Sequence, residues 1–157
     1  MNTSLTAAAV PTRSARPVPA ILVGGVIAGA IDAGLAFYTF GPRMPQGIAS
    51  GLLGRQAFQM GATSWILGLC IHFFIALSMA AVYYAASRKL PFLVEYPLIC
   101  GLFYGMALYF VMNLVVVPLS AIHASGPIAR KDLMEGLLVN MILIALPMTY
   151  SVRNFSR

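Results

Sequence analysis

The chain has 157 residues, of which 60% are hydrophobic and 9% are charged, whereas soluble domains carry roughly 25% charged residues. Its net charge of +6 comes from ten Lys and Arg residues against four acids. This composition excludes a soluble enzyme and a nucleic-acid-binding protein, and it indicates that a lipid bilayer is the main partner of the chain.

Charged residues are absent from three long windows and nearly absent from a fourth. The three are 56–87, 96–129 and 136–152, and the fourth, 17–42, contains only Asp32. A helix needs about 20 mostly apolar residues to cross a bilayer, so these windows predict four spans. We expect them at about 20–40, 64–86, 97–118 and 132–151, as an all-α, integral membrane, up-down-up-down four-helix bundle.

The predicted spans lie between two short tails. Residues 1–19 are rich in Ala, Ser, Thr and Pro and cannot bury a core, so we expect a flexible N-terminal tail. The apolar run that starts at Ala20 is longer than the core of a secretory signal and lacks a cleavage pattern, which predicts a retained span. Residues 152–157 are expected to form a short basic C-terminal tail.

The connection after the first span is the longest loop and contains the sequence PQGIASGLLGRQAFQM. At 100° per residue this segment shows no clean apolar stripe, so it is not a typical amphipathic anchor. It predicts a short interfacial helix or a partly re-entrant segment. In the fourth span, Pro147 frees the carbonyl of Leu143, which predicts a kink.

Orientation follows from the basic residues and the ends of the spans from the aromatic ones. Six positive residues fall on the side of the termini and four on the other side, which favours two cytoplasmic termini in an inner membrane. The six are Arg13, Arg16, Arg88, Lys89, Arg153 and Arg157, and the four are Arg43, Arg55, Arg130 and Lys131. Aromatic residues mark the predicted ends as an interfacial belt, namely Phe40, Trp65, Tyr83, Tyr84 and Tyr150.

Each predicted span contains a polar residue that hydrocarbon would reject. These residues follow small residues at helical spacing, so they should point into the bundle, where small residues let helices approach closely. At 1.5 Å per residue the four fall in one layer. The polar residues are Asp32, His72, Asn113 and Asn140, and the glycines expected to pack between helices are Gly25, Gly29, Gly68, Gly101, Gly105 and Gly136.

This polar layer has two interpretations. One is a proton or ion relay, or a small polar binding site, in which Asp32 is protonated or partnered by His72. The other is a set of interhelical hydrogen bonds that fix the packing. No catalytic motif, metal-ligand spacing or cofactor fingerprint occurs, and Cys70 and Cys100 each lie alone in an apolar window. We therefore expect no enzyme, no cofactor and no metal site.

Three segments and the acid of the first span suggest a family. SGLLGR (Ser50 to Arg55), RKLPFL (Arg88 to Leu93) and MNLVVVPLSA (Met112 to Ala121) resemble small bacterial inner-membrane proteins with four predicted helices. More distantly, the architecture is similar to YagU-like proteins. The resemblance covers about Ala20 to Tyr150. It implies a bacterial membrane location and assigns no catalytic residue.

Two functions fit these patterns. The first is a non-enzymatic membrane protein, an accessory or envelope-homeostasis component in which the polar layer holds the bundle together. The second is a small proton- or ion-coupled transporter or channel that works through Asp32 and His72. Four spans leave little room for a lumen, so the second function favours a homo-oligomer. Besides lipid, a second copy or another membrane protein is the expected partner.

Overall fold

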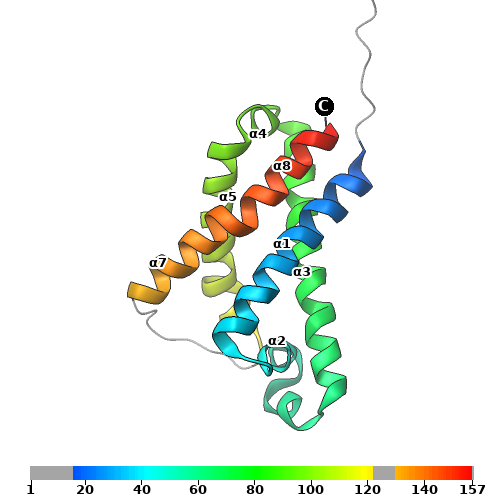
Figure 1. Ribbon diagram of the computed structural model, residues 1–157, viewed down its shortest axis with the longest axis vertical. Helices are drawn as coiled ribbons and strands as arrows, with labels where there is room; N and C mark the ends of the chain where they lie inside the picture. Colours follow the sequence, from blue (N-terminus) through cyan, green and yellow to red (C-terminus); the bar gives the residue numbers. More distant parts are fainter. Residues whose placement is uncertain (1–15, 122–129, 157) are drawn as a thin grey trace, which may run out of the picture.

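Four long helical stretches make up most of the computed structural model, which describes residues 16–121 and 130–156 (Figure 1). They contain 24, 28, 23 and 27 residues, and each is long and apolar enough to cross a membrane. The described part of the chain holds helices and no strand, which confirms the all-α class. The stretches are α1 (Pro17–Phe40), α3 (Ala62–Lys89), α5 to α6 (Pro97–Val111, Val117–Leu119) and α7 to α8 (Arg130–Leu138, Ala145–Ser156).

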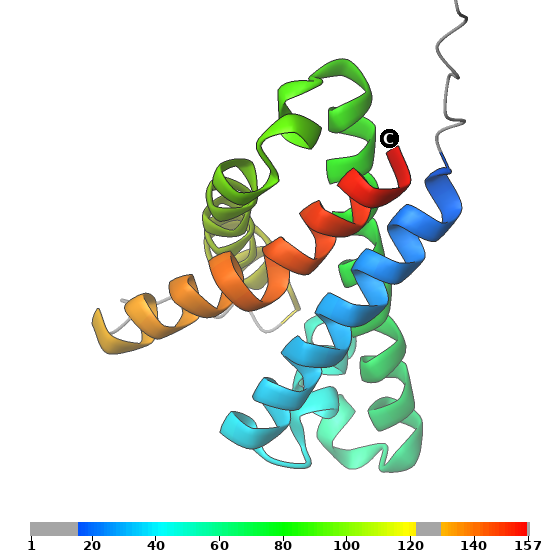
Figure 2. The same ribbon diagram turned by 45° about the horizontal axis from the view of Figure 1, so that its top comes forward.

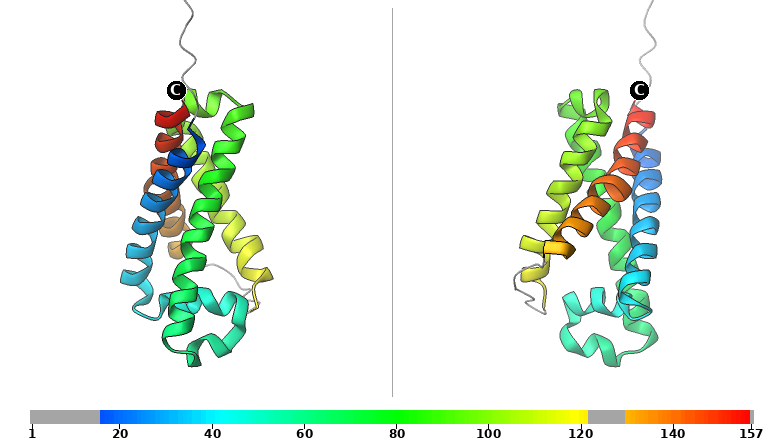
Figure 3. Two further views of the ribbon diagram at one scale, coloured as in Figure 1. Left: turned by 90° about the vertical axis from the view of Figure 1, so that its right-hand side faces the viewer. Right: turned by 60° about the vertical axis from the view of Figure 1, so that its left-hand side comes forward.

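The two ends of the molecule are built differently. At one end α1 begins, α8 ends, and the one-turn helix α4 (Phe92–Glu95) joins α3 to α5 (Figure 1). There the backbone N–H of Arg16 donates to the carbonyl of Phe155 at 3.1 Å. At the other end α2 (Met44–Leu53) and the 3₁₀ segment η1 (Gly54–Gln59) lie across the long helices (Figure 3).

Helix α1 is the central element of the packing. It contacts α3 on one side and α8 on the other, while α5 packs against the fourth helical stretch. Figure 2 shows α8 running beside α1, whereas α7 diverges from it towards the far end of α5. The core is built of small residues and a few large ones, with one cluster made of Ala28, Ala76, Ala80, Ile144 and Met148.

The helices extend beyond the predicted spans at both termini of the chain. Helix α1 already begins at Pro17, and residues 1–15 of the predicted N-terminal tail lie outside the described residues. The last helix runs to Ser156, although we expected a tail from residue 152. The reason is tertiary packing, because Val152 is fully buried with Ala20 and Tyr83, and Phe155 packs against the same cluster.

A short helix does follow the first long one, and a glycine allows it to dock. The N-terminus of α2 lies so close to α3 that a Cβ atom placed on Gly68 would overlap the carbonyl of Pro45. Residue 68 must therefore be glycine for α2 to keep this position. On the far side of α2, the N–H of Ala121 donates to the carbonyl of Gly51 at 2.7 Å, which ties α2 to the end of α6.

Two of the long helical stretches contain a π-helical segment, η2 (Met112–Val116) and η3 (Val139–Ile144). Each ends just before a proline, Pro118 and Pro147 respectively. Proline has no N–H, so the carbonyl four residues earlier loses its helical donor, and both of those carbonyls lie within the π segments. In a π segment each carbonyl accepts from the N–H five residues later instead of four, which offers the freed carbonyl another backbone donor. The interruption that the sequence predicts at Pro147 therefore takes the form of a π segment.

Candidate functional site

A small cavity of about 110 Å³, here named the polar cavity, lies in the interior of the bundle. Three of the four predicted polar residues line it, namely Asp32 of α1, His72 of α3 and Asn140 of η3. The remaining lining is apolar and includes Ile48 of α2. Asn113 is not among the lining residues, although its neighbour Met112 is. The structure thus brings residues that are far apart in sequence to one place.

His72 connects α3 to α1. Its ring is buried, and Nε2 lies 2.9 Å from the carbonyl oxygen of Gly29. Because a carbonyl oxygen only accepts, Nε2 must carry the proton in this contact. Helix α1 can come this close because Gly29 has no side chain, and a Cβ there would lie 3.1 Å from both Ala76 and Phe73.

Asp32 is half-buried at the polar cavity, one turn after the glycine that His72 binds. In residues 16–121 and 130–156, however, no hydrogen bond or salt bridge reaches the Asp32 carboxyl group. The direct hydrogen bond that we expected between Asp32 and His72 is therefore not seen, and Nε2 of His72 instead contacts the backbone of α1.

Asn113 and Asn140 bind to the backbone of their own helices. The Nδ2 atom of Asn113 donates to the carbonyl of Tyr109 at 2.9 Å, and that of Asn140 donates to the carbonyl of Gly136 at 3.0 Å. Both residues stand in π segments, where the regular i→i+4 pattern is interrupted. Their amides provide donors to backbone carbonyls near these interruptions.

All six glycines that we singled out lie against another helix. Gly25 and Gly29 of α1 face α3, and Gly101 and Gly105 of α5 face α8 and η3. Between the long helices the closest approach is at Gly105, where a Cβ would lie 2.5 Å from the carbonyl oxygen of Asn140 and 2.5 Å from the Cα of Met141. Gly68 faces α2, and Gly136 lies on the ring of Tyr109.

Other interhelical contacts were missed at the sequence level. The Ser151 hydroxyl of α8 donates to the carbonyl of Ala20 in α1 at 2.9 Å. The Tyr104 hydroxyl of α5 donates to the carbonyl of Met79 in α3 at 2.7 Å. A Cβ placed on Gly24 would lie 3.1 Å from the Cα of Met148. Gly24 could have been found from the sequence, since it is adjacent to the predicted Gly25. The two glycines point in different directions, however, so that Gly25 faces α3 and Gly24 faces α8.

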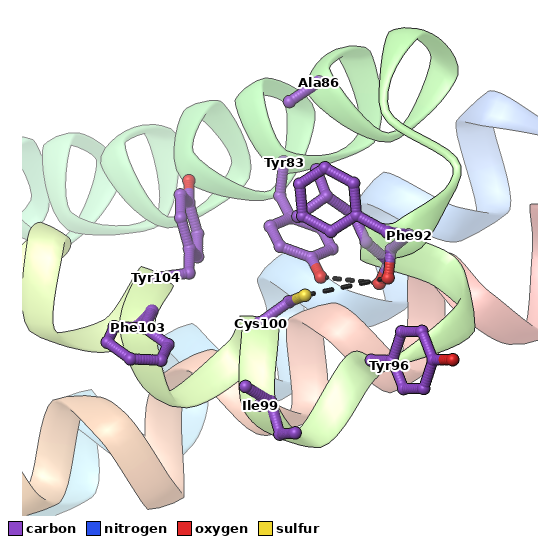
Figure 4. Close-up of a pocket in the computed structure, with 9 residues that line it drawn as sticks. Tyr83, Ala86, Phe92, Tyr96, Ile99, Cys100, Phe103 and Tyr104 are labelled. Carbon is purple, nitrogen blue, oxygen red and sulfur yellow. Dashed lines mark hydrogen bonds between the residues drawn. The ribbon is translucent and has the colours of Figure 1, made fainter.

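A second and larger hollow, about 710 Å³ in volume and here named the aromatic groove, lies between α3, α4 and α5 (Figure 4). The sequence indicates Tyr83 only as part of an interfacial belt and predicts no groove. The groove forms because α4 turns the chain so that aromatic residues from three elements face one another. They are Tyr83, Phe92, Tyr96, Phe103 and Tyr104, with Ala86, Leu93, Ile99 and Cys100 between them.

Within the described ranges, no group of three or more His, Cys, Asp and Glu side chains is placed to hold a metal ion. No protein-family model, curated protein or solved structure matches the chain. The likeness to YagU-like proteins therefore stays a prediction from the sequence.

Proposed function

We propose that the chain is a multi-pass integral membrane protein of a bacterial inner membrane, with both termini on the cytoplasmic side. Large apolar side chains that point outward from the long helices support this proposal. Phe74 is 71% exposed and Leu114 is 64% exposed, for example. Such surfaces are unfavourable in water and suit contact with acyl chains. The start of α1 and the end of α8 share one end of the molecule, as two termini on one side require (Figure 1).

Reporter fusions test the membrane placement. A fluorescent protein fused after Arg157 should fluoresce in the cytoplasm, and alkaline phosphatase fused there should be inactive. Alkaline phosphatase inserted after Gln59, at the opposite end, should be active. The reverse pattern would overturn the orientation, and release of the protein from membranes by alkaline carbonate would overturn the integral placement.

Within the membrane we assign the polar side chains chiefly to helix association, in a non-enzymatic accessory or envelope-homeostasis component. The supporting observation is that side chains of one helix donate to the backbone of another. His72 binds Gly29, Ser151 binds Ala20, and Tyr104 binds Met79. These bonds link α1 to α3, α1 to α8 and α3 to α5. They hold the bundle together, and a second copy or another membrane protein would then dock on its outer surface.

Asp32 favours a second candidate function, a small proton- or ion-coupled transporter or channel. Its carboxyl group lines the polar cavity, yet it has no hydrogen-bond partner in the described part of the chain. At roughly 30 Å³ per water molecule, the cavity of about 110 Å³ has room for about three water molecules or for one small cation. A carboxyl group beside an imidazole in such a space can take up and release a proton.

Flux through reconstituted vesicles separates the two candidates. Vesicles that contain the purified chain and a trapped pH-sensitive dye are given a pH jump, and the decay of the gradient is followed. Asp32→Asn keeps a polar side chain of similar size but removes the titrating group. If transport operates, this variant should lose the flux, and the control Asp132→Asn, near the start of α7, should retain it.

A negative result in the same assay is also informative. If the wild-type chain and Asp32→Asn both fold and neither dissipates the gradient faster than empty vesicles, proton transport through Asp32 is excluded. Folding is checked by circular dichroism and by a single peak in size-exclusion chromatography. The assignment to helix association would then stand.

A further inference from the structure

The aromatic groove lies at the end of the bundle where α1 begins and α8 ends. Its walls are the last turns of α3, the one-turn helix α4 and the first turns of α5, as the labelled side chains of Figure 4 show. The volume of about 710 Å³ falls within the roughly 300–1,000 Å³ that is usual for small-molecule sites. Ile99 is 57% exposed and Phe103 is 63% exposed, so the groove opens on the outer surface of the bundle.

Two of the three tyrosine hydroxyls of the lining already donate to backbone carbonyls, and the third, that of Tyr96, points away from the other lining residues (Figure 4). The Tyr83 hydroxyl donates to Leu93 at 2.9 Å, and the Tyr104 hydroxyl donates to Met79 at 2.7 Å. The Cys100 thiol lies 3.7 Å from the carbonyl of Phe92. The groove therefore presents ring faces and hydrocarbon to an occupant, which suits a hydrocarbon chain and offers little to a polar solute.

Positive charge lies beside this apolar surface. Arg88 and Lys89 form the last turn of α3, between the lining residues Ala86 and Phe92 in sequence, and both are exposed. Neither forms a salt bridge with any described residue. Glu95 of α4 is the one acid between Ala86 and Cys100, so this rim keeps an excess of positive charge. Cations at the C-terminus of a helix also stabilise its dipole, which explains their presence but not the adjacent hollow.

We propose that the aromatic groove binds one anionic phospholipid. An acyl chain lies against the rings of α3, α4 and α5, and the phosphate group contacts Arg88 and Lys89. A lipid fits both features because it joins a hydrocarbon chain to an anionic headgroup, and basic sites between helices at the cytoplasmic surface bind such headgroups. The lipid enters sideways from the leaflet, since the groove is open on the outer surface. This inference rests on the membrane placement proposed above.

A tryptophan in the groove reports its occupant. The chain has one tryptophan, Trp65, which lies at the opposite end of the molecule, where its indole N–H donates to Pro42 at 3.0 Å. In a Trp65→Phe, Phe103→Trp variant, fluorescence comes from the groove alone. The protein is placed in bilayers that contain a small fraction of brominated phosphatidylglycerol or of brominated phosphatidylcholine. We expect stronger quenching by the brominated phosphatidylglycerol.

Matched charge variants assign the preference to the rim. Arg88→Gln with Lys89→Gln should make the quenching by the two lipids equal. Arg43→Gln with Arg55→Gln removes the same charge at the other end of the molecule and should leave the preference unchanged. Equal quenching by both lipids in the parent variant, or a preference that survives the loss of Arg88 and Lys89, would overturn the proposal.

Cysteine alkylation gives a second readout that leaves the aromatic residues in place. In a Cys70→Ser chain, Cys100 is the one remaining thiol and lines the groove. Its alkylation by an apolar maleimide should be slower in phosphatidylglycerol bilayers than in phosphatidylcholine bilayers. Equal alkylation rates in the two bilayers would overturn the lipid assignment. Oxidative crosslinking of Cys100 between two copies would also overturn it, in favour of a dimer contact at the groove. The reporter fusions test membrane placement separately, so the two failures are distinguishable.

Discussion

The α1–α3 pair and the pair formed by α5–α6 and α7–α8 use polar residues in different ways. Helices α1 and α3 are regular α-helices along their whole length, and His72 of one donates to the backbone of the other. The helices of the second pair are each interrupted by a π segment. In those segments Asn113 and Asn140 donate to carbonyls of their own helices.

The sequence pattern in the two pairs is nearly the same. Ser64 and Gly68 precede His72 at steps of four, and Gly136 precedes Asn140 by four residues. The pairs differ in their backbone, because Pro118 and Pro147 remove backbone donors in the second pair and the asparagines stand in the π segments that precede these prolines. His72 thus joins two helices where the backbone ladder is complete, whereas Asn113 and Asn140 bond within their own helices where it is interrupted.

Gly105→Ala should give the largest loss in the free energy of unfolding, because Gly105 packs its backbone directly against the backbone of η3. The new Cβ would lie 2.5 Å from atoms of Asn140 and Met141, which cannot move aside as a flexible side chain can. Overpacking of this kind costs about 1–3 kcal/mol. Unfolding by sodium dodecyl sulfate in mixed micelles, followed by circular dichroism, measures the loss.

Gly34→Ala is the matched control for this substitution. A Cβ on Gly34 has no other atom within 4 Å, and Gly34, like Gly105, lies inside an α-helical segment. Its stability should equal or slightly exceed that of the wild type, because alanine favours a helix more than glycine does. Equal losses from Gly105→Ala and Gly34→Ala would show that the close approach of α5 to η3 is not needed for stability.

His72→Phe should have a smaller effect, limited to the uninterrupted pair. The variant keeps a ring of similar size but loses the hydrogen bond to Gly29. Interhelical hydrogen bonds in membrane proteins contribute on average about 0.6 kcal/mol and at most about 1.7 kcal/mol, so we expect a loss in this range. The same detergent titration measures it. A variant as stable as the wild type would remove His72 from the list of residues that hold α1 and α3 together.

Asn140→Leu should have the smallest effect on association. Its amide bonds to Gly136 in the same helix, and this bond survives when the helices separate within the membrane. The free energy of unfolding should therefore stay within about 0.5 kcal/mol of the wild-type value, below the effect of His72→Phe. A loss larger than that of His72→Phe in the same titration would show that Asn140 also acts between helices.

Much of the fold could be predicted because it depends on local properties of the chain. Charge-free windows indicated the four long helices, and the spacing of Gly25, Gly29 and Gly105 indicated faces that do contact other helices. The ends of the helices were less predictable. The last helix continues to Ser156 because Val152 and Phe155 find partners in α1 and α3, and a local pattern contains no information on such partners.

The candidate site could be predicted in part for the same reason. Asp32, His72 and Asn140 come to one cavity because their depths along the helices match, and depth follows from residue counts. Residue counts could not predict the hydrogen-bond partners of these side chains. The ring of His72 meets Gly29 rather than Asp32 because the rotation and distance of α3 against α1 decide the contact.

The sequence by itself determined an all-helical chain with four long apolar helices and small residues on their facing sides, because hydropathy and helical period act within each segment. The tertiary structure decided that His72 binds a backbone carbonyl and that no described residue forms a hydrogen bond with the Asp32 carboxyl group. It also created the aromatic groove beside Arg88 and Lys89. These features need residues from two or three helices at once. Their positions depend on how the helices pack against one another, which no single segment specifies.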